Sequence, residues 1–208
     1  MKTILVSIAL FVAMAMTSSA AIRVAPPQTK SAVDTKLAMR KLWEDHITYT
    51  RNYIISALAG LPDADAVAAR LMKNQEEIGA AIKPYYGDAA GDKLTSLLKE
   101  HITVASEVVK AAKAPNSVTL AAAQKKWEAN ADDIARFLAG ANPNWKEPEI
   151  RGMLHKHLDL TTGEVTARLM KDWAADQKSY DEGHAHMLMF SDVLTDGIAK
   201  QFPDKFTK

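Results

Sequence analysis

Glycine and proline breaks divide most of this chain into segments of helical length, and this division restricts the fold more than any other feature. The breaks are Gly60-Leu61-Pro62, Lys83-Pro84, Ala114-Pro115-Asn116, Gly140-Ala141-Asn142-Pro143 and Gln201-Phe202-Pro203. Between them, apolar residues recur every three or four positions, which is the spacing of one face of an α-helix. The sequence therefore predicts helices near residues 34–59, 64–82, 89–113, 117–139, 148–171 and 179–200, with a kink allowed at Gly163.

The residue composition agrees with a fold made of helices alone. Ala, Leu, Lys and Glu are abundant, runs of β-branched residues are few, and the 208 residues include only 9 glycines. The chain has no cysteine, so its stability must come from packing. We expect an all-α protein, an up-and-down helical bundle of about six helices with a core like that of a four-helix bundle, in a single domain over residues 32–208.

The first residues have the pattern of an export signal. Lys2 precedes an apolar run over residues 4–16, and Thr17-Ser18-Ser19-Ala20 supplies the small residues that a signal peptidase reads. We predict a secretory signal peptide over residues 1–20 and a flexible leader over residues 21–31, which contains Pro26-Pro27. An uncleaved membrane anchor is the alternative, but the run is short for a permanent span. The expected location is the periplasm or the extracellular medium.

The charge balance and the later hydropathy exclude some partners. The chain carries 26 Lys and Arg against 25 Asp and Glu, and loss of Lys2 with the signal peptide brings the formal charge from +1 to zero. No general attraction to nucleic acid is therefore expected. No apolar run after residue 21 is long enough to span a membrane once the signal peptide is removed. The sequence leaves the oligomeric state open.

Four histidines lie in the apolar stripes of four different predicted helices. They are His46, His101, His157 and His186. If these helices surround one axis, the four imidazoles meet at one level, with Glu164 as an auxiliary ligand two turns beyond His157. Imidazole suits Zn, Cu, Fe or Ni, and bundle interiors are where facing helices assemble such sites. The leading prediction is an exported bundle that binds a transition metal or a small ligand through these residues.

The remaining histidines and two methionines are placed by the same helical geometry. His184 lies about 160° from His186 on the predicted helix, so the two cannot chelate one ion together. His155 is expected to face solvent while His157 faces inward. Met187 and Met189 would add soft ligands that are attractive to copper in an exported protein.

Two other functions are compatible with the sequence. In the first, a structural or protein-interaction bundle binds no ligand, and its buried histidines are satisfied by carbonyls or by side chains such as Tyr49, Tyr53, Asn130 and Thr161. In the second, an enzyme of unknown reaction uses the same interior. The sequence leans against an enzyme, because it has no phosphate-binding loop, no dinucleotide fingerprint and no nucleophile elbow. The Glu-x-x-His signature of di-iron bundles is missing as well.

Short internal repeats hint at duplicated helical hairpins. Residues 69–73 recur letter for letter at 167–171, residues 97–101 resemble residues 153–157, and residues 43–46 resemble residues 127–130. The three spacings do not give one constant period.

Five stretches carry a resemblance to a known family over nearly all of the chain after residue 21. They are Leu42-Trp-Glu-Asp-His46, Pro84-Tyr-Tyr-Gly87, Asn142-Pro-Asn-Trp145, His157-Leu-Asp-Leu-Thr-Thr-Gly-Glu164 and His184-Ala-His-Met-Leu-Met-Phe-Ser-Asp192. The chain resembles a family of small, uncharacterised bacterial helical proteins, some of which carry automatic labels such as glycosyltransferase or acetylglutamate kinase. The resemblance implies a bacterial helical protein and supplies no catalytic residues.

Overall fold

The computed structural model describes residues 29–114 and 117–207, and these residues form a helical bundle. The helices are α1 (Lys30–Ala59), α2 (Ala64–Tyr86), α3 (Asp88–Lys113), α4 (Ser117–Ala141), α5 (Glu147–Leu169) and α6 (Trp173–Gln201), followed by the short 3-10 helix η1 (Pro203–Phe206). No strand occurs among the described residues, so the predicted all-α, up-and-down bundle is confirmed. The predicted signal peptide, residues 1–20, lies outside the described residues.

Two helices begin earlier than the sequence indicated, because side-chain caps were overlooked. Helix α1 begins at Lys30, inside the predicted leader, and the Thr29 hydroxyl accepts a hydrogen bond from the Ala32 N–H at 3.2 Å. Helix α6 begins at Trp173, six residues before the predicted start. There the Asp172 carboxylate accepts a hydrogen bond from the Ala175 N–H at 3.0 Å. Such caps satisfy amide groups that the first turn of a helix leaves unpaired.

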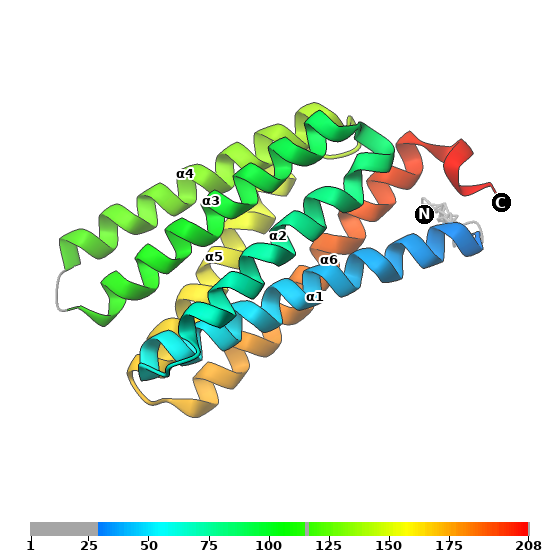
Figure 1. Ribbon diagram of the computed structural model, residues 1–208. Coiled ribbons are helices and arrows are strands. Elements are labelled where there is room, and N and C mark those ends of the chain that lie inside the picture. Colours follow the sequence, from blue (N-terminus) through cyan, green and yellow to red (C-terminus); the bar gives the residue numbers. More distant parts are fainter. Residues whose placement is uncertain (1–28, 115–116, 208) are drawn as a thin grey trace, which may run out of the picture.

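The six helices form a closed ring in which each packs against its neighbours in the chain and α6 packs against α1 (Figure 1). Helices α1, α3 and α5 also contact one another, so these three meet at the centre. The last turns of α1, α3 and α5 and the first turns of α2, α4 and α6 lie at one end of the bundle (Figure 1). The centre is thus built from three helices, where the sequence suggested a core of four.

The three hairpins are repeats of one another in their pattern of buried residues. Equivalent core positions are Met39, Leu94 and Ile150 in the inner helices, and Ile78, Ile134 and Phe190, or Ile82, Leu138 and Leu194, in the outer ones. Equivalent positions in α2, α4 and α6 are 56 residues apart. Equivalent positions in α1 and α3 are 55 residues apart, because the first hairpin is one residue shorter. The resemblance between residues 97–101 and 153–157 falls on equivalent helices. The identical strings at 69–73 and 167–171 lie on α2 and α5, which are not equivalent.

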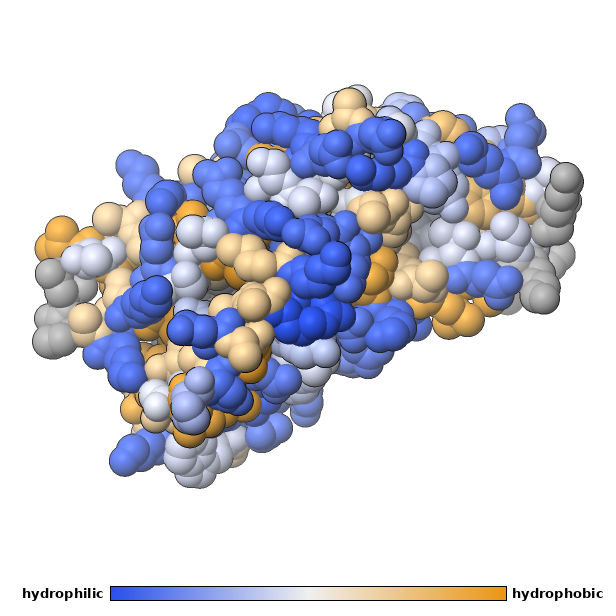
Figure 2. Space-filling model, in the orientation of Figure 1, coloured by the Kyte–Doolittle hydropathy of each residue, from blue (hydrophilic) through white to orange (hydrophobic). Residues whose placement is uncertain are grey.

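On the face shown in Figure 2, hydrophilic side chains cover much of the surface, with apolar areas between them. Ion pairs join neighbouring helices across this surface, for example Arg40 with Asp192 at 2.7 Å and Lys99 with Glu76 at 2.6 Å. No helix among the described residues is both long and apolar enough to cross a membrane.

Helices α2 and α3 approach most closely where two glycines face each other. A Cβ atom added to Gly79 would lie 2.6 Å from the Gly91 carbonyl oxygen and 1.9 Å from the Thr95 hydroxyl oxygen. A backbone atom of a packed helix cannot move away cheaply. The absence of a side chain at Gly79 is therefore what permits this contact.

We predict that Gly79→Ala lowers the free energy of unfolding by about 1 kcal/mol or more, since overpacking costs about 1–3 kcal/mol and exceeds the gain in helix propensity. Gly152→Ala is the control, because nothing lies within 4 Å of a Cβ atom added there. It should stabilise the protein by about 0.5–1 kcal/mol. Urea unfolding of both variants measures the difference, and equal stability would contradict the close contact.

Candidate functional site

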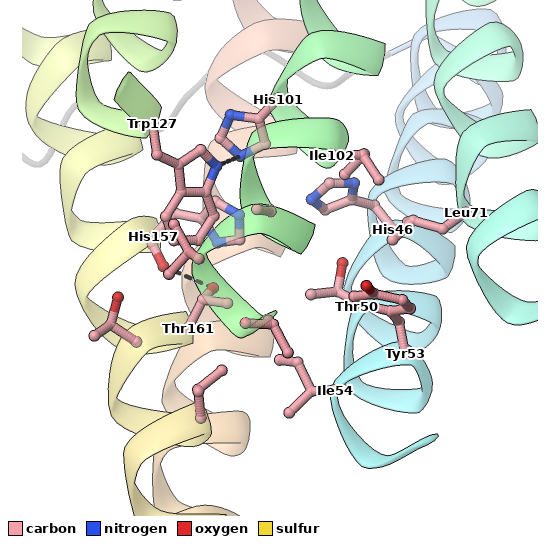
Figure 3. A pocket seen from close by; sticks show the side chains of 15 residues that line it. His46, Thr50, Tyr53, Ile54, Leu71, His101, Ile102, Trp127, His157 and Thr161 are labelled. Atoms are coloured by element: carbon pink, nitrogen blue, oxygen red, sulfur yellow. Dashed lines mark hydrogen bonds between the residues drawn. The ribbon is translucent and has the colours of Figure 1, made fainter. Parts of the chain in front are cut away.

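The centre of the bundle holds three buried histidines, one from each inner helix. His46 in α1, His101 in α3 and His157 in α5 are 2%, 3% and 2% exposed. The ring centroids of His46 and His157 are 5.6 Å apart, and those of His101 and His157 are 5.9 Å apart. Figure 3 shows the three rings converging at one level of the bundle. They occupy equivalent positions in the three hairpins, so the predicted convergence holds for these three.

His186 takes a different place from the one the sequence suggested. It lies on the outer helix α6, is half-buried, and its Nε2 donates a hydrogen bond to the Met153 carbonyl oxygen at 2.7 Å. A helical wheel identifies a buried stripe but does not tell which neighbouring helix that stripe meets. His186 therefore lies between α6 and α5 and outside the central ring contacts.

Glu164 belongs to a buried ion-pair network and not to the histidine cluster. Its carboxylate lies 2.7 Å from the Arg51 guanidinium, which also binds Asp176 at 3.0 Å. Arg168 donates a further hydrogen bond to Asp176 at 2.8 Å. Burial raises the pKa of Glu164 to about 7, although Arg51 opposes this rise. The sequence analysis missed this network because Asp176 lies before the predicted start of its helix.

The peripheral histidines and the two methionines are separated as the helical faces predict. His155 and His184 are partly exposed, and their Nε2 atoms lie 2.8 Å from Asp132 and 3.2 Å from Glu44. Met187 is 1% exposed, whereas Met189 is 52% exposed. Only Met187 is thus available as an internal sulfur donor.

Both nitrogens of His101 are occupied. The Asn130 amide nitrogen donates to the Leu97 carbonyl at 3.2 Å, which turns its oxygen towards His101 Nδ1 at 2.9 Å. We therefore assign the proton of His101 to Nδ1. Its Nε2 accepts a hydrogen bond from the Trp127 indole N–H at 3.2 Å. His101 accordingly has no lone pair to spare.

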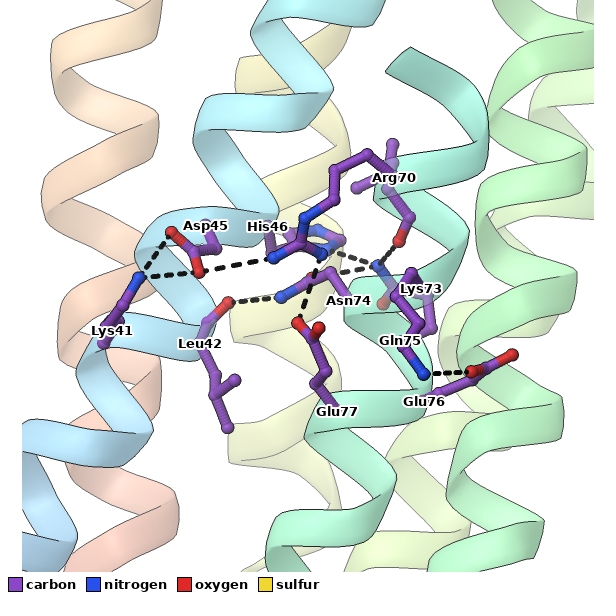
Figure 4. Close-up of polar contacts among 11 residues, drawn as sticks. Lys41, Leu42, Asp45, His46, Arg70, Lys73, Asn74, Gln75, Glu76 and Glu77 are labelled. Carbon is purple, nitrogen blue, oxygen red and sulfur yellow. Dashed lines mark hydrogen bonds and ion pairs between the residues drawn. The ribbon is translucent and has the colours of Figure 1, made fainter. Parts of the chain in front are cut away.

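His46 is held by an amide in a similar way (Figure 4). The Gln75 amide nitrogen bonds to the Leu71 carbonyl at 2.8 Å and to the Asn74 side-chain oxygen at 3.1 Å, and it lies 3.3 Å from His46 Nδ1. An amide nitrogen only donates, so Nδ1 of His46 accepts and its proton is on Nε2. The amide has two N–H groups for three acceptors, so its contact with His46 Nδ1, the longest of the three, is a shared one.

His157 differs from the other two histidines at its Nδ1 atom. Its Nδ1 is buried and has no hydrogen-bond partner among the described residues. The Thr161 hydroxyl donates to the His157 backbone carbonyl at 2.9 Å and so does not satisfy the ring. Leaving such a group unpaired costs about 1–3 kcal/mol. The Thr50 hydroxyl and the Gln75 amide oxygen beside the cluster are also buried without a partner, and together with the His157 ring nitrogen they call for a functional explanation.

The open space beside the three rings is small. A cavity of about 20 Å³ is lined by the three histidines, Thr50 and mainly apolar side chains (Figure 3). A space of this size holds about one water-sized particle, whereas organic ligands need pockets of about 300–1,000 Å³. The interior therefore has room for an ion-sized particle and not for an organic molecule.

Burial keeps all three imidazoles neutral. Loss of solvation lowers the pKa of His46 to about 3 and that of His101 to about 4. The pKa of His157 is well below its usual value, first through burial and then through the neighbouring histidines His46, His101 and His186. At neutral pH each ring is a neutral base, which is the form that binds metal ions.

No metal site is already formed among the residues that the structure describes. Within residues 29–114 and 117–207, no group of three or more His, Asp or Glu side chains is arranged to hold an ion. The centroid separations alone suit a shared ion, since metal–nitrogen bonds near 2 Å place ring centroids roughly 5–6 Å apart. The amide and indole partners of His46 and His101, however, already use their lone pairs.

Helical periodicity predicts the three central histidines as inward residues, but it does not indicate Gln75 or Trp127 as their partners. Asn130 is only one of several partners that the sequence offers. A signal was available, since Gln75 and Asn130 each follow the histidine they contact by 29 residues.

Comparison with known proteins adds no relationship. No protein-family model matches the chain, and no curated protein or solved structure is significantly similar to it. The resemblance to bacterial helical proteins stays a prediction.

We predict that stability falls as the pH is lowered from about 6.5 towards 4. The unfolded chain takes up a proton at each histidine near pH 6.5, while the folded chain does not, because the pKa values of His46 and His101 are about 3 and about 4. Each histidine then contributes a slope of up to about 1.4 kcal/mol per pH unit. Glu164 has the opposite effect on stability between its pKa in the unfolded chain and its pKa of about 7 in the folded chain. In that range its slope of stability against pH cancels the slope of about one histidine.

Urea unfolding at several pH values from 7.5 to about 4.5 measures this slope. His157→Leu should reduce it by up to about 1.4 kcal/mol per pH unit, while His155→Leu, which changes a partly exposed ring, should leave it nearly unchanged. Identical slopes in wild type and His157→Leu would contradict a neutral buried His157.

We predict that Arg51→Met destabilises the protein strongly, because it leaves the Glu164 and Asp176 carboxylates buried without their shared guanidinium. Breaking a buried ion pair costs about 3–5 kcal/mol. Arg136→Met is the control. Its side chain is 61% exposed, against 12% for Arg51, and its surface pair with Asp133 is worth about 1 kcal/mol or less. Thermal and urea unfolding compare the two, and losses of equal size would show that the network is not a buried one.

Proposed function

We propose that this protein is an exported helical bundle that binds one transition-metal ion in its interior, with His157 as the central ligand. The observation that carries the proposal is the buried, unpaired Nδ1 of His157. The corresponding nitrogens of His46 and His101 have amide partners. A neutral imidazole carries a lone pair on one of its two nitrogens, and in the tautomer protonated at Nε2 the unpaired Nδ1 of His157 offers that lone pair to a metal ion.

The surroundings of His157 favour an ion over an organic ligand. The cavity of about 20 Å³ has no room for a larger molecule. Zn, Cu, Ni and Fe all accept imidazole. His46 and His101 pack against the His157 ring, at 5.6 and 5.9 Å between centroids. In this proposal they shape and desolvate the site and are not ligands themselves.

An ion has a short route to the interior. Tyr53, Leu71 and Ile102 line both the histidine cavity and an open groove on the bundle surface. These side chains separate the groove from the cavity. A change of rotamer at this point would admit an ion without unfolding a helix.

The sequence of residues 1–20 supports export. An exported protein can bind metal ions that have not yet been bound by the metal-buffering molecules of the cytosol. The lack of cysteine leaves His, carboxylate and Met as its metal ligands. A catalytic role is not part of the proposal, because the unpaired imidazole lies beside a cavity of about 20 Å³, which has no room for a substrate.

A second candidate is a purely structural bundle. It is favoured by the hydrogen bonds of His101, which is satisfied at both nitrogens by Asn130 and Trp127. In that case His157 would be a core residue that tolerates an unpaired nitrogen. Metal binding separates the two candidates directly.

We expect the mature protein, purified without a histidine tag, to retain about one equivalent of metal after incubation with Zn, Cu, Ni or Fe salts and gel filtration, as one closed site would. Elemental analysis gives the ratio. His157→Ala should retain less than about one-tenth of an equivalent, because it removes the central ligand. His155→Ala, two residues along the same helix and partly exposed, should bind as the wild type does.

Two results would overturn the metal proposal in favour of the structural bundle. One is a wild-type protein that retains less than about one-tenth of an equivalent of each metal. The other is equal retention by His157→Ala and His155→Ala, provided that circular dichroism shows both variants to be folded.

A further inference from the structure

An open groove lies on the bundle surface where the first hairpin meets the second, between α2 and α3. Its volume is about 620 Å³, within the range of about 300–1,000 Å³ of pockets that hold organic ligands. Tyr53, Leu71 and Ile102, labelled in Figure 3, line its buried end, and Lys110 and Lys113 line its outer end. Ile102 and Lys113 are 11 residues apart on α3, a length of roughly 16 Å. The groove therefore has room for an extended organic molecule.

The second junction, between α4 and α5, is nearly filled at the equivalent place. By the spacing of 56 residues, Gln124 stands there at the position of Ala68, and Trp127 at that of Leu71. The hollow that remains has a volume of about 140 Å³. Longer side chains thus occupy the space that is open at the first junction.

The third junction, between α6 and α1, is filled by a charged and an aromatic side chain. Tyr180 stands at the position of Ala68, and Arg51 at that of Ser106. The guanidinium carbon of Arg51 lies 4.5 Å from the centroid of the Tyr180 ring. A hollow of about 240 Å³ remains at this junction, closer to the end of the bundle. The first junction is therefore set apart by its small side chains, and the groove is a departure from the repeat.

The groove combines an apolar floor with a cationic rim. Lys110 forms no ion pair with any described residue, and the ammonium group of Lys113 donates a hydrogen bond to the Ala57 carbonyl oxygen at 3.2 Å. Among the described residues, Asp65 is the only carboxylate that lines the groove. Two lysines against one aspartate leave a formal charge of +1. The lining thus complements a molecule with an apolar body and one negative charge.

We propose that this groove binds a free organic acid with a hydrocarbon chain. The chain lies along Leu71 and Ile102, and the carboxylate lies at Lys110 and Lys113. The apolar floor favours such an acid over a compact anion, because burial of apolar surface supplies affinity that lysines at an exposed rim do not. This inference goes beyond the proposed metal binding and does not depend on it, since none of these residues is a metal ligand.

The test is isothermal titration calorimetry of the mature protein with octanoate, below the concentration at which octanoate forms micelles. Two probes with the same chain, 1-octanol and octylammonium, replace the carboxylate by a neutral and by a cationic group. The wild type should bind octanoate at one site, and at least about threefold more tightly than either other probe, as expected for exposed ion pairs.

A first variant closes the groove. Ala68→Tyr introduces the residue of the third junction and should weaken octanoate binding by about tenfold or more, because its ring occupies the space of the chain. Ala69→Tyr is the control. Residue 69 is the next position on the same helix, is exposed and does not line the groove, so this variant should bind as the wild type does.

A second variant removes the charge and leaves the floor intact. Lys110→Met combined with Lys113→Met should weaken octanoate binding by about threefold or more and should bind 1-octanol as the wild type does. Lys93→Met, which changes an exposed lysine on the same helix outside the groove, should leave both affinities unchanged. Urea unfolding verifies that all variants are folded.

Several results would overturn the inference. They are a wild type that binds none of the three probes, equal or tighter binding of 1-octanol or octylammonium, and equal binding of octanoate by Ala68→Tyr and Ala69→Tyr. A wild-type dimer that Ala68→Tyr dissociates in gel filtration would show that a second copy of the chain covers the groove instead. His157→Ala should bind octanoate as the wild type does, so the metal site and the groove can fail independently.

Discussion

An imidazole in an apolar interior has to be neutral and has to find hydrogen bonds, and the centre of this bundle is built around that requirement. Each inner helix brings one histidine to the axis, where burial lowers its pKa far below neutrality. The outer helix of the same hairpin then supplies polar side chains at the same level. In the first two hairpins these contacts, made by Gln75 and Asn130, tie the outer helix to the inner helix at the level of the histidine. The buried polar layer therefore specifies the packing of the apolar layers on either side.

The fold could be predicted from the sequence because the residues that end its helices act locally. Gly60 and Gly87 have positive φ angles at helix ends, and glycine is suited to that conformation. The starts of α1 and α6 were harder to place, since Thr29 and Asp172 cap helices from within polar stretches that resemble loops. The ring order of the helices is not local at all. It depends on which neighbouring helix the apolar stripe of each helix packs against. For this reason the sequence predicted His186 at the centre, although α6 is an outer helix.

The candidate site could also be predicted only in part: its inward histidines could be recognised from the sequence, but their distant partners could not. Helical periodicity correctly selected His46, His101 and His157 as inward residues, because one face of each helix is almost wholly apolar. It could not show that Glu164 has Arg51 as its partner, since those residues are 113 positions apart. The 29-residue offset between His101 and Asn130 was visible in principle. Its meaning became clear only once the hairpins were known to be equivalent.

Among the described residues, the two buried carboxylates, Glu164 and Asp176, both lie in the third hairpin, and this asymmetry is the strongest general argument that the molecule does more than pack. Glu164 stands where the other hairpins have Tyr53 and Val108, and Asp176 stands where they have Ala64 and Leu120. His186 and Met187 are further departures in the same hairpin. Replacing apolar core residues by charged ones costs stability unless each charge is paired. Arg51 and Arg168 supply that pairing for the two carboxylates, while His157 is left unpaired. The third hairpin packs as its two neighbours do but differs from them at this level of the core. We therefore expect the binding function in the third hairpin.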